Sequence, residues 1–139
     1  MSRRVLVIDD DQALRGTLCR LFKRLGFDAV LVAAADEALR VADGCQFAVI
    51  LSDYHLDGGN AAHLLRDLAA LQPDASVIVM SGDHSLDAAA FAHAGTSVEV
   101  VHKPFTLGPL LEVLKDGLSR NLARLASRDR SEAAMWSAP

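Results

Sequence analysis

The chain has 139 residues, of which 51% are hydrophobic and 23% are charged, a composition typical of a folded globular domain rather than a disordered segment. Its 14 Lys and Arg against 18 Asp and Glu give a net charge of −4, so the molecule as a whole is not suited to binding a polyanion. The apolar runs are too short to cross a bilayer, and no long apolar segment near the start resembles a secretory signal. With only Cys19 and Cys45, we expect reduced thiols and a cytoplasmic protein without membrane contact.

Five short apolar runs predict five β-strands. They are rich in Val, Ile, Leu and Ala, and they are apolar without interruption, which is the pattern of strands covered on both faces. The five predicted strands are residues 5–8, 29–32, 47–51, 76–80 and 98–101.

Helical patterns separate these runs. Apolar residues at spacings of three and four between Leu14 and Leu25 predict the first helix, and Gly26 is its stop signal. Asn60 is a suitable N-cap for the third helix, which carries several leucines up to Leu71. The five predicted helices are residues 14–25, 36–42, 61–71, 85–93 and 107 onward.

Strands that alternate with helices are typical of βαβ units and of a parallel sheet with helices on both sides. Since the crossovers in such units are right-handed, few arrangements remain, and we predict an α/β fold with a doubly wound, five-stranded parallel sheet. Ligands of these folds bind beyond the carboxyl ends of the strands. A functional site is therefore expected at that edge of the sheet.

Polar side chains follow four of the five runs. Asp9 and Asp10 follow the first, Asp53 the third, Ser81 the fourth and Lys103 the fifth. Carboxylates that meet in a partly desolvated cleft repel one another unless a cation joins them, and oxygen ligands with open positions suit Mg²⁺. With a lysine and a hydroxyl nearby, such a site fits a phosphoryl group. A carboxylate can also act as the nucleophile that forms an aspartyl phosphate, and Asp53 has the best position for this role because it follows a strand buried on both faces.

These residues resemble the receiver domain of two-component response regulators. The resemblance runs from about Arg3 to Gly117 and consists of four motifs in the family's order and spacing, at residues 5–11, 51–56, 79–82 and 102–105. It implies the flavodoxin-like (βα)5 fold, with strand order 2-1-3-4-5. We predict a receiver domain over residues 1–119, followed by a helix extension or flexible tail over residues 120–139.

The resemblance also implies a role for each polar side chain. Asp53 would be the phosphoacceptor, and Ser81 and Lys103 would bind oxygens of the phosphoryl group. A receiver catalyses only its own phosphorylation and dephosphorylation, so we expect no enzyme that acts on a separate substrate. The groups implied to hold Mg²⁺ are the side chains of Asp9, Asp10 and Asp53 and the main-chain carbonyl of His55.

The implied phosphoryl donor is a phosphohistidine on a sensor histidine kinase or on a histidine phosphotransfer protein, within a two-component or phosphorelay pathway. The downstream protein target is unknown from the sequence. The stretch after Gly117 is too short for a helix-turn-helix domain, so we expect a single-domain receiver that does not bind DNA. Leucines continue at helical spacing from Leu107 to Leu125. This pattern is consistent with a homodimer through the last helix or with a solvated terminus.

Two departures from the family leave other functions open. Val100 stands where receivers usually carry Tyr or Phe, and the loop after Asp53 lacks the proline of many members and is similar to receivers of hybrid histidine kinases. The valine favours an alternative in which the fold binds partners without being phosphorylated. A second alternative is an aspartyl-nucleophile phosphohydrolase of the haloacid dehalogenase type, whose motif Asp9-x-Asp11 matches superficially. That family usually carries Thr or Val at the position of Ala13.

Overall fold

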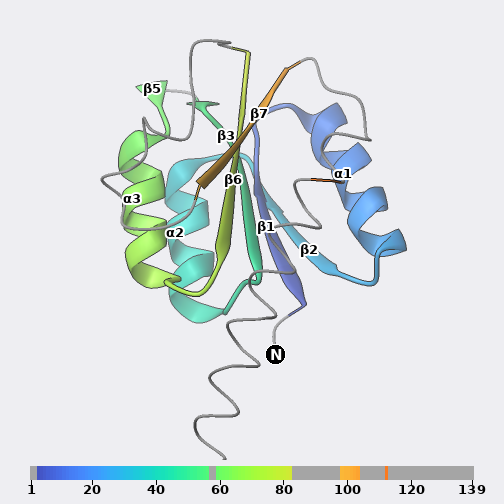
Figure 1. Ribbon diagram of the computed structural model, residues 1–139, viewed down its shortest axis with the longest axis horizontal. Helices are drawn as coiled ribbons and strands as arrows, with labels where there is room; N and C mark the ends of the chain where they lie inside the picture. Colours follow the sequence, from blue (N-terminus) through green and yellow to red (C-terminus); the bar gives the residue numbers. More distant parts are fainter. Residues whose placement is uncertain (1–2, 57–58, 83–97, 104–111, 113–139) are drawn as a thin grey trace, which may run out of the picture.

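The computed structural model describes residues 3–56, 59–82, 98–103 and 112. Within them, five parallel strands form one sheet in the order β2-β1-β3-β6-β7, with α1 on one face and α2 and α3 on the other (Figure 1). Taken along the chain, this is the predicted strand order 2-1-3-4-5, and the doubly wound α/β fold is confirmed. The strands of this sheet are β1 (Arg4–Ile8), β2 (Asp28–Val32), β3 (Val49–Asp53), β6 (Ser76–Ser81) and β7 (Val98–His102).

Local signals account for much of the first helix, α1 (Gln12–Arg24). The carboxylate of Asp11 accepts hydrogen bonds from the amides of Ala13 and Leu14, at 3.0 and 3.2 Å, and so caps the N-terminus. Shortly after its end, Gly26 adopts a φ of +83°, which a residue with a side chain rarely adopts, and this lets the chain turn back toward β2. The other helices are α2 (Ala35–Gly44) and α3 (Ala62–Leu71).

The sheet divides the core into two layers. Along β1, Leu6 and Ile8 pack toward α2 and α3, whereas Val5 and Val7 pack toward α1, and all four are completely buried. The uninterrupted apolar runs thus reflect strands with helices on both faces. Burial on both sides holds the ends of these strands in fixed positions. The polar residues that follow are therefore attached to a backbone that is held in place.

The N-cap predicted at Asn60 is wrong. Residues Gly59–Asn60 form strand β5, which pairs with strand β4 (His55–Leu56) in an antiparallel ladder, and helix α3 starts two residues later at Ala62. Its N-cap is Ala61, which makes no side-chain capping bond. The ladder between β4 and β5 therefore decides where α3 begins.

The third strand also starts later than predicted, at Val49 rather than Phe47. The buried side chain of Gln72, at the end of α3, replaces sheet pairing there: its Oε1 accepts a hydrogen bond from the Phe47 amide at 3.0 Å. Its Nε2 donates to the carbonyls of Ala42 and Cys45, at 2.8 and 2.6 Å. One amide side chain thus joins the ends of α2 and α3 to the segment that leads into β3.

Several predictions fall on other parts of the chain. The helix predicted at 85–93, most of the last helix, the tail over 120–139 and the homodimer contact lie outside the described residues. Among the residues that the structure does describe, none belongs to a helix with the length and apolar character needed to span a membrane.

Candidate functional site

The polar residues that follow the strands meet at one edge of the sheet. The strand register places Ile8 opposite Ser52 and Asp53 opposite Met80, so that β1, β3 and β6 end at nearly the same level. The pairing of Ser81 with His102 brings the end of β7 to this level too. The expectation that the strand ends converge at a common edge is confirmed by this register.

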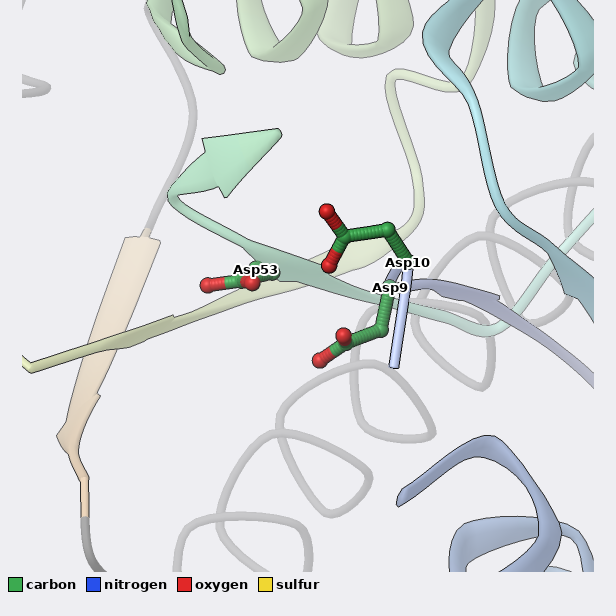
Figure 2. A group of neighbouring side chains, drawn as sticks. All are labelled: Asp9, Asp10 and Asp53. Carbon is green, nitrogen blue, oxygen red and sulfur yellow. The ribbon is translucent and has the colours of Figure 1, made fainter. Parts of the chain in front are cut away.

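Three aspartates form a tight group at this edge, here called the acidic cluster. Side-chain oxygens of Asp9, Asp10 and Asp53 lie within 4.8 Å of one another, with Asp9 and Asp53 buried and Asp10 exposed. Figure 2 shows Asp9 and Asp10 coming from the end of β1 and Asp53 from the end of β3. At this separation, two unit charges repel by about 3.5 kcal/mol at an effective dielectric constant of about 20. The acidic cluster therefore needs positive charge.

Lys103 supplies part of that charge. Its Nζ lies 3.4 Å from Oδ2 of Asp9 and 3.4 Å from Oδ2 of Asp53, so a single ammonium group bridges two buried carboxylates. The Lys103 amide donates to the carbonyl of Ser81 at 2.6 Å, which fixes the lysine backbone to the end of β6. The single ammonium contacts two of the three carboxylates, so Lys103 alone does not balance the charge of the acidic cluster.

Asp9 is the most constrained member of the acidic cluster. Its side chain is completely buried, and its Oδ1 accepts a hydrogen bond from the Asp11 amide at 2.8 Å. Burial raises the pKa of the Asp9 carboxyl, and the charge of Asp53 adds to this, whereas the Asp11 amide and Lys103 lower it. The desolvation effect is the largest, so the ionised form of Asp9 destabilises the folded state.

The chain after Asp53 is held close to the acidic cluster. The amide of Tyr54 donates to the Met80 carbonyl and the carbonyl of Tyr54 accepts from the Ala61 amide, both at 2.8 Å. The His55 amide lies 3.4 Å from Oδ1 of Asp53, and the rings of Tyr54 and His55 meet edge to face at 5.1 Å. The His55 peptide therefore borders the Asp53 carboxylate, while the role of its carbonyl as a metal ligand stays a prediction.

Ser81 is completely buried at the end of β6, next to β3 and β7. Its main chain is tied to Lys103, as described above, and the register places Asp53 opposite the preceding residue, Met80. The structure thus brings the predicted serine to the same edge as the acidic cluster. Its contact with a phosphoryl oxygen stays a prediction.

Sequence reasoning did not identify Arg15. This residue of α1 donates from Nη1 to the main-chain carbonyl of Asp9 at 2.7 Å. A signal was available, because Arg15 lies four residues after the N-cap Asp11, and a long side chain in the first turn of a helix can reach back toward the preceding loop. Ser52 makes a similar contact, since its hydroxyl donates to the carbonyl of Asp53 at 2.9 Å.

The acidic cluster has the chemistry of a site for a hard divalent cation. Carboxylate oxygens are the ligands that Mg²⁺ prefers, and one or two carboxylates suffice when water and phosphate oxygens complete the shell. A cation at this position would offset the repulsion that Lys103 leaves. The residues present therefore fit Mg²⁺.

Comparison with known proteins agrees with this geometry. The model of the family described as the response regulator receiver domain matches residues 5–115. The DNA-binding transcriptional regulator NtrC of Azospirillum brasilense is 34% identical over 118 residues, which cover 84% of this chain and 24% of that protein. The chain covers less than half the length of the curated relatives it matches: 24% of this NtrC protein, and 28% and 49% of two other relatives.

Solved structures of similar fold include a CheY-like response regulator receiver domain protein from Methanospirillum hungatei. It has a TM-score of 0.80 and 26% identity, and the match covers 89% of this chain and 99% of that one. A response regulator protein from Burkholderia pseudomallei, solved with a phosphorylated aspartic acid, a calcium ion and citrate, has a TM-score of 0.72 and 30% identity. That match covers 90% of this chain and 74% of the other.

Proposed function

This chain belongs to the family of response regulator receiver domains of two-component signalling, and we propose that it accepts a phosphoryl group on Asp53 in a Mg²⁺-dependent reaction. The observation that carries the proposal is the position of the Lys103 ammonium, 3.4 Å from the carboxylate of Asp53, beside the acidic cluster. In phosphoryl transfer the protein's main tasks are positioning and charge neutralisation, and these residues are arranged for both.

The proposed step is an in-line transfer from a phosphohistidine. A carboxylate oxygen of Asp53 attacks phosphorus, a P–O bond forms, the P–N bond to the donor imidazole breaks, and the imidazole leaves with the bonding pair. Lys103 stays close to the carboxylate and neutralises charge on the incoming phosphoryl oxygens. Ser81 donates a hydrogen bond to another of these oxygens.

Receiver domains generally bind Mg²⁺ at an acidic pocket, and we assign this role here to the side chains of the acidic cluster and to the main-chain carbonyl of His55. When bound, the metal would neutralise charge on the phosphoryl oxygens. The Burkholderia protein is described with both a phosphorylated aspartic acid and a calcium ion, which supports a divalent cation beside the acceptor in this chain as well. The donor set of three carboxylates within 4.8 Å supports the same assignment.

The donor that this function requires is a phosphohistidine protein, either a sensor histidine kinase or a histidine phosphotransfer protein. We place this receiver in the cytoplasm, together with the phosphohistidine-bearing part of its donor. The chain acts as a catalyst only on its own Asp53. The transfer reverses when the phosphoryl group returns to a histidine and ends when water hydrolyses the acyl phosphate.

The phosphohydrolase alternative needs a second free carboxylate two residues after the nucleophile. In this chain the Asp11 carboxylate accepts hydrogen bonds from the amides of Ala13 and Leu14, as the cap of α1. A carboxylate held in this way is poorly placed to donate a proton to a leaving group. The geometry at Asp11 therefore favours the receiver over the phosphohydrolase, and repeated turnover of small phosphomonoesters would reverse that preference.

The alternative without phosphorylation depends on Val100. This half-buried residue of β7 packs against the apolar cluster beneath α2 and α3, where it offers neither a ring nor a hydroxyl to report a change at Asp53. Partner binding that is unchanged by Asp53→Ala would support this alternative.

The decisive test is labelling of the full chain with acetyl phosphate or with a phosphorylated kinase in the presence of Mg²⁺. We expect Asp53→Asn to abolish acid-stable, hydroxylamine-sensitive labelling, because the amide cannot attack phosphorus. Asp67→Asn, the same change at an exposed position of α3, is the matched control and is expected to label normally. Labelling that persists in Asp53→Asn would place the acceptor elsewhere.

A further inference from the structure

We propose that Arg15 is a positioning residue that sets the affinity of the site for Mg²⁺ by holding the loop between β1 and α1. It contacts neither the metal nor the phosphoryl group, and it acts through the main chain that carries Asp9 and Asp10. The expected effect on Mg²⁺ affinity rests on the proposed function, whereas the role of Arg15 in holding the loop does not.

Arg15 holds the loop at both of its ends. Its guanidinium donates from Nη1 to the carbonyl of Asp9 at 2.7 Å, and its own amide donates to the carbonyl of Asp11 at 3.0 Å. Asp10, the exposed member of the acidic cluster, lies between these two carbonyls. The bond to the Asp11 carbonyl is a main-chain helix bond that any residue at position 15 would make, so the arginine side chain contributes the bond on the Asp9 side of Asp10.

Other contacts fix Asp9 on its remaining sides. The Asp9 amide donates to the carbonyl of Val32 in β2 at 3.1 Å, and its Oδ1 accepts from the Asp11 amide. The bond from Arg15 is the one that ties the Asp9 carbonyl to α1. It is charge-assisted and short, and such bonds are about twice as strong as those between neutral groups. Removing it frees the peptide between Asp9 and Asp10 and lets the bond from the Asp11 amide to Asp9 Oδ1 open more often, while the bond from the Asp9 amide to Val32 persists.

Two effects of Arg15 on Mg²⁺ binding have opposite signs. Its positive charge lies near the acidic cluster, so simple electrostatics predicts that its removal strengthens the binding of a cation. Its hydrogen bond keeps the two carboxylates of the loop in place, so loss of positioning predicts weaker binding. Groups that orient metal ligands typically contribute about 10-fold or more to affinity. We therefore expect the positioning effect to dominate.

The test compares Arg15→Gln with Arg20→Gln in the full chain, by titration with MgCl₂ followed calorimetrically. Arg20 is the matched control, because it is an exposed arginine of the same helix whose guanidinium lies 3.5 Å from the Thr17 hydroxyl. We expect Arg15→Gln to weaken Mg²⁺ binding about 10-fold and Arg20→Gln to leave it unchanged. Unchanged or tighter binding in Arg15→Gln overturns the proposal.

A second readout needs no metal. In metal-free protein, the hydrogen exchange of the Asp11 amide, which donates to Asp9, reports how firmly the loop is held. We expect exchange at Asp11 to be about 10-fold faster in Arg15→Gln, while exchange at Leu51 in the core of β3 stays as in the parent chain. Equal acceleration at both sites would mean a general loss of stability and would overturn the proposal. If the parent chain binds no Mg²⁺, the proposed function fails, and this exchange experiment still decides whether Arg15 holds the loop.

Discussion

Replacing Asp9 with asparagine separates the contribution of this residue to stability from its contribution to function. The carboxyl group is completely buried and burial raises its pKa, so the ionised group destabilises the fold at neutral pH. Asparagine has nearly the same shape, and its oxygen can still accept from the Asp11 amide. We expect Asp9→Asn to be more stable than the parent chain without metal and to lose the stabilisation that Mg²⁺ provides.

The expected gain follows from the charges that face Asp9. At an effective dielectric constant of about 20, the attraction to Lys103 at 3.4 Å is about 5 kcal/mol, and repulsion from a carboxylate within 4.8 Å is about 3.5 kcal/mol. Asp53 therefore offsets most of the attraction, and the exposed Asp10 offsets part of the remainder through solvent. After these charge interactions largely cancel, the main remaining contribution is the cost of taking the Asp9 carboxylate out of water. The raised pKa of Asp9 indicates that this cost exceeds the remaining attraction, so Asp9→Asn is expected to gain stability at neutral pH.

The gain depends on pH in a defined direction. Because the folded-state pKa of Asp9 is raised, the folded protein binds more protons than the unfolded one at pH values between the two pKa values. The parent chain therefore loses stability from this group as the pH rises through the folded-state pKa. The advantage of Asp9→Asn is largest at neutral pH and shrinks as the carboxyl of the parent chain becomes protonated.

Urea unfolding with and without Mg²⁺ measures both effects. A cation at ten times its dissociation constant stabilises the parent chain by about 1.4 kcal/mol, and we expect little of this in Asp9→Asn. Asp11→Asn is the control, since it makes the same change two residues away at an exposed N-cap where asparagine serves equally well. If metal-free Asp9→Asn is less stable than the parent chain at neutral pH, the attraction of Lys103 outweighs burial and the reasoning is refuted.

Two further substitutions test other parts of the structure. Lys103→Ala removes an ammonium that contacts two carboxylates at 3.4 Å, so we expect Mg²⁺ to bind more tightly in calorimetry. We also expect labelling of Asp53 to be weak but detectable. Weaker Mg²⁺ binding in this variant would show that the lysine does not compete with the cation. Gln72→Leu removes three hydrogen bonds worth about 1 kcal/mol each, so we expect a loss of about 3 kcal/mol in urea unfolding. The exposed Gln12→Leu should change stability by less than about 0.5 kcal/mol, and a similarly small effect at Gln72 would contradict this account.

The fold could be predicted because its strands carry the strongest kind of sequence signal. A strand buried on both faces, such as β1 or β3, is a continuous apolar run, and the order of strands and helices then restricts the topology. The residues of the site followed from the same topology, since parallel strands bring their carboxyl ends to one edge. The topology also placed Lys103 at this edge, whereas its contacts with Asp9 and Asp53 at 3.4 Å are a finding of the structure.

Interactions that override local signals were not predictable in this way. Asn60 is a residue type suited to an N-cap. Its backbone instead pairs with His55 in a two-residue ladder that no sequence pattern predicts. Phe47 continues an apolar run, yet its amide bonds to Gln72, 25 positions away. In both cases a backbone group found a tertiary partner, and element boundaries are the features most sensitive to such competition.

The excess of negative charge at the sheet edge is explained by a site that binds a cation. Asp9 and Asp53 end strands that are otherwise apolar, and burying a carboxylate costs stability unless it is fully paired. Lys103 is shared equally between the two, so it cannot fully neutralise both, and Asp10 adds a third negative charge within 4.8 Å. Stability alone would favour one carboxylate for the one ammonium. The excess negative charge raises affinity for a hard cation, and a phosphoryl group on Asp53 would increase the need for that cation further.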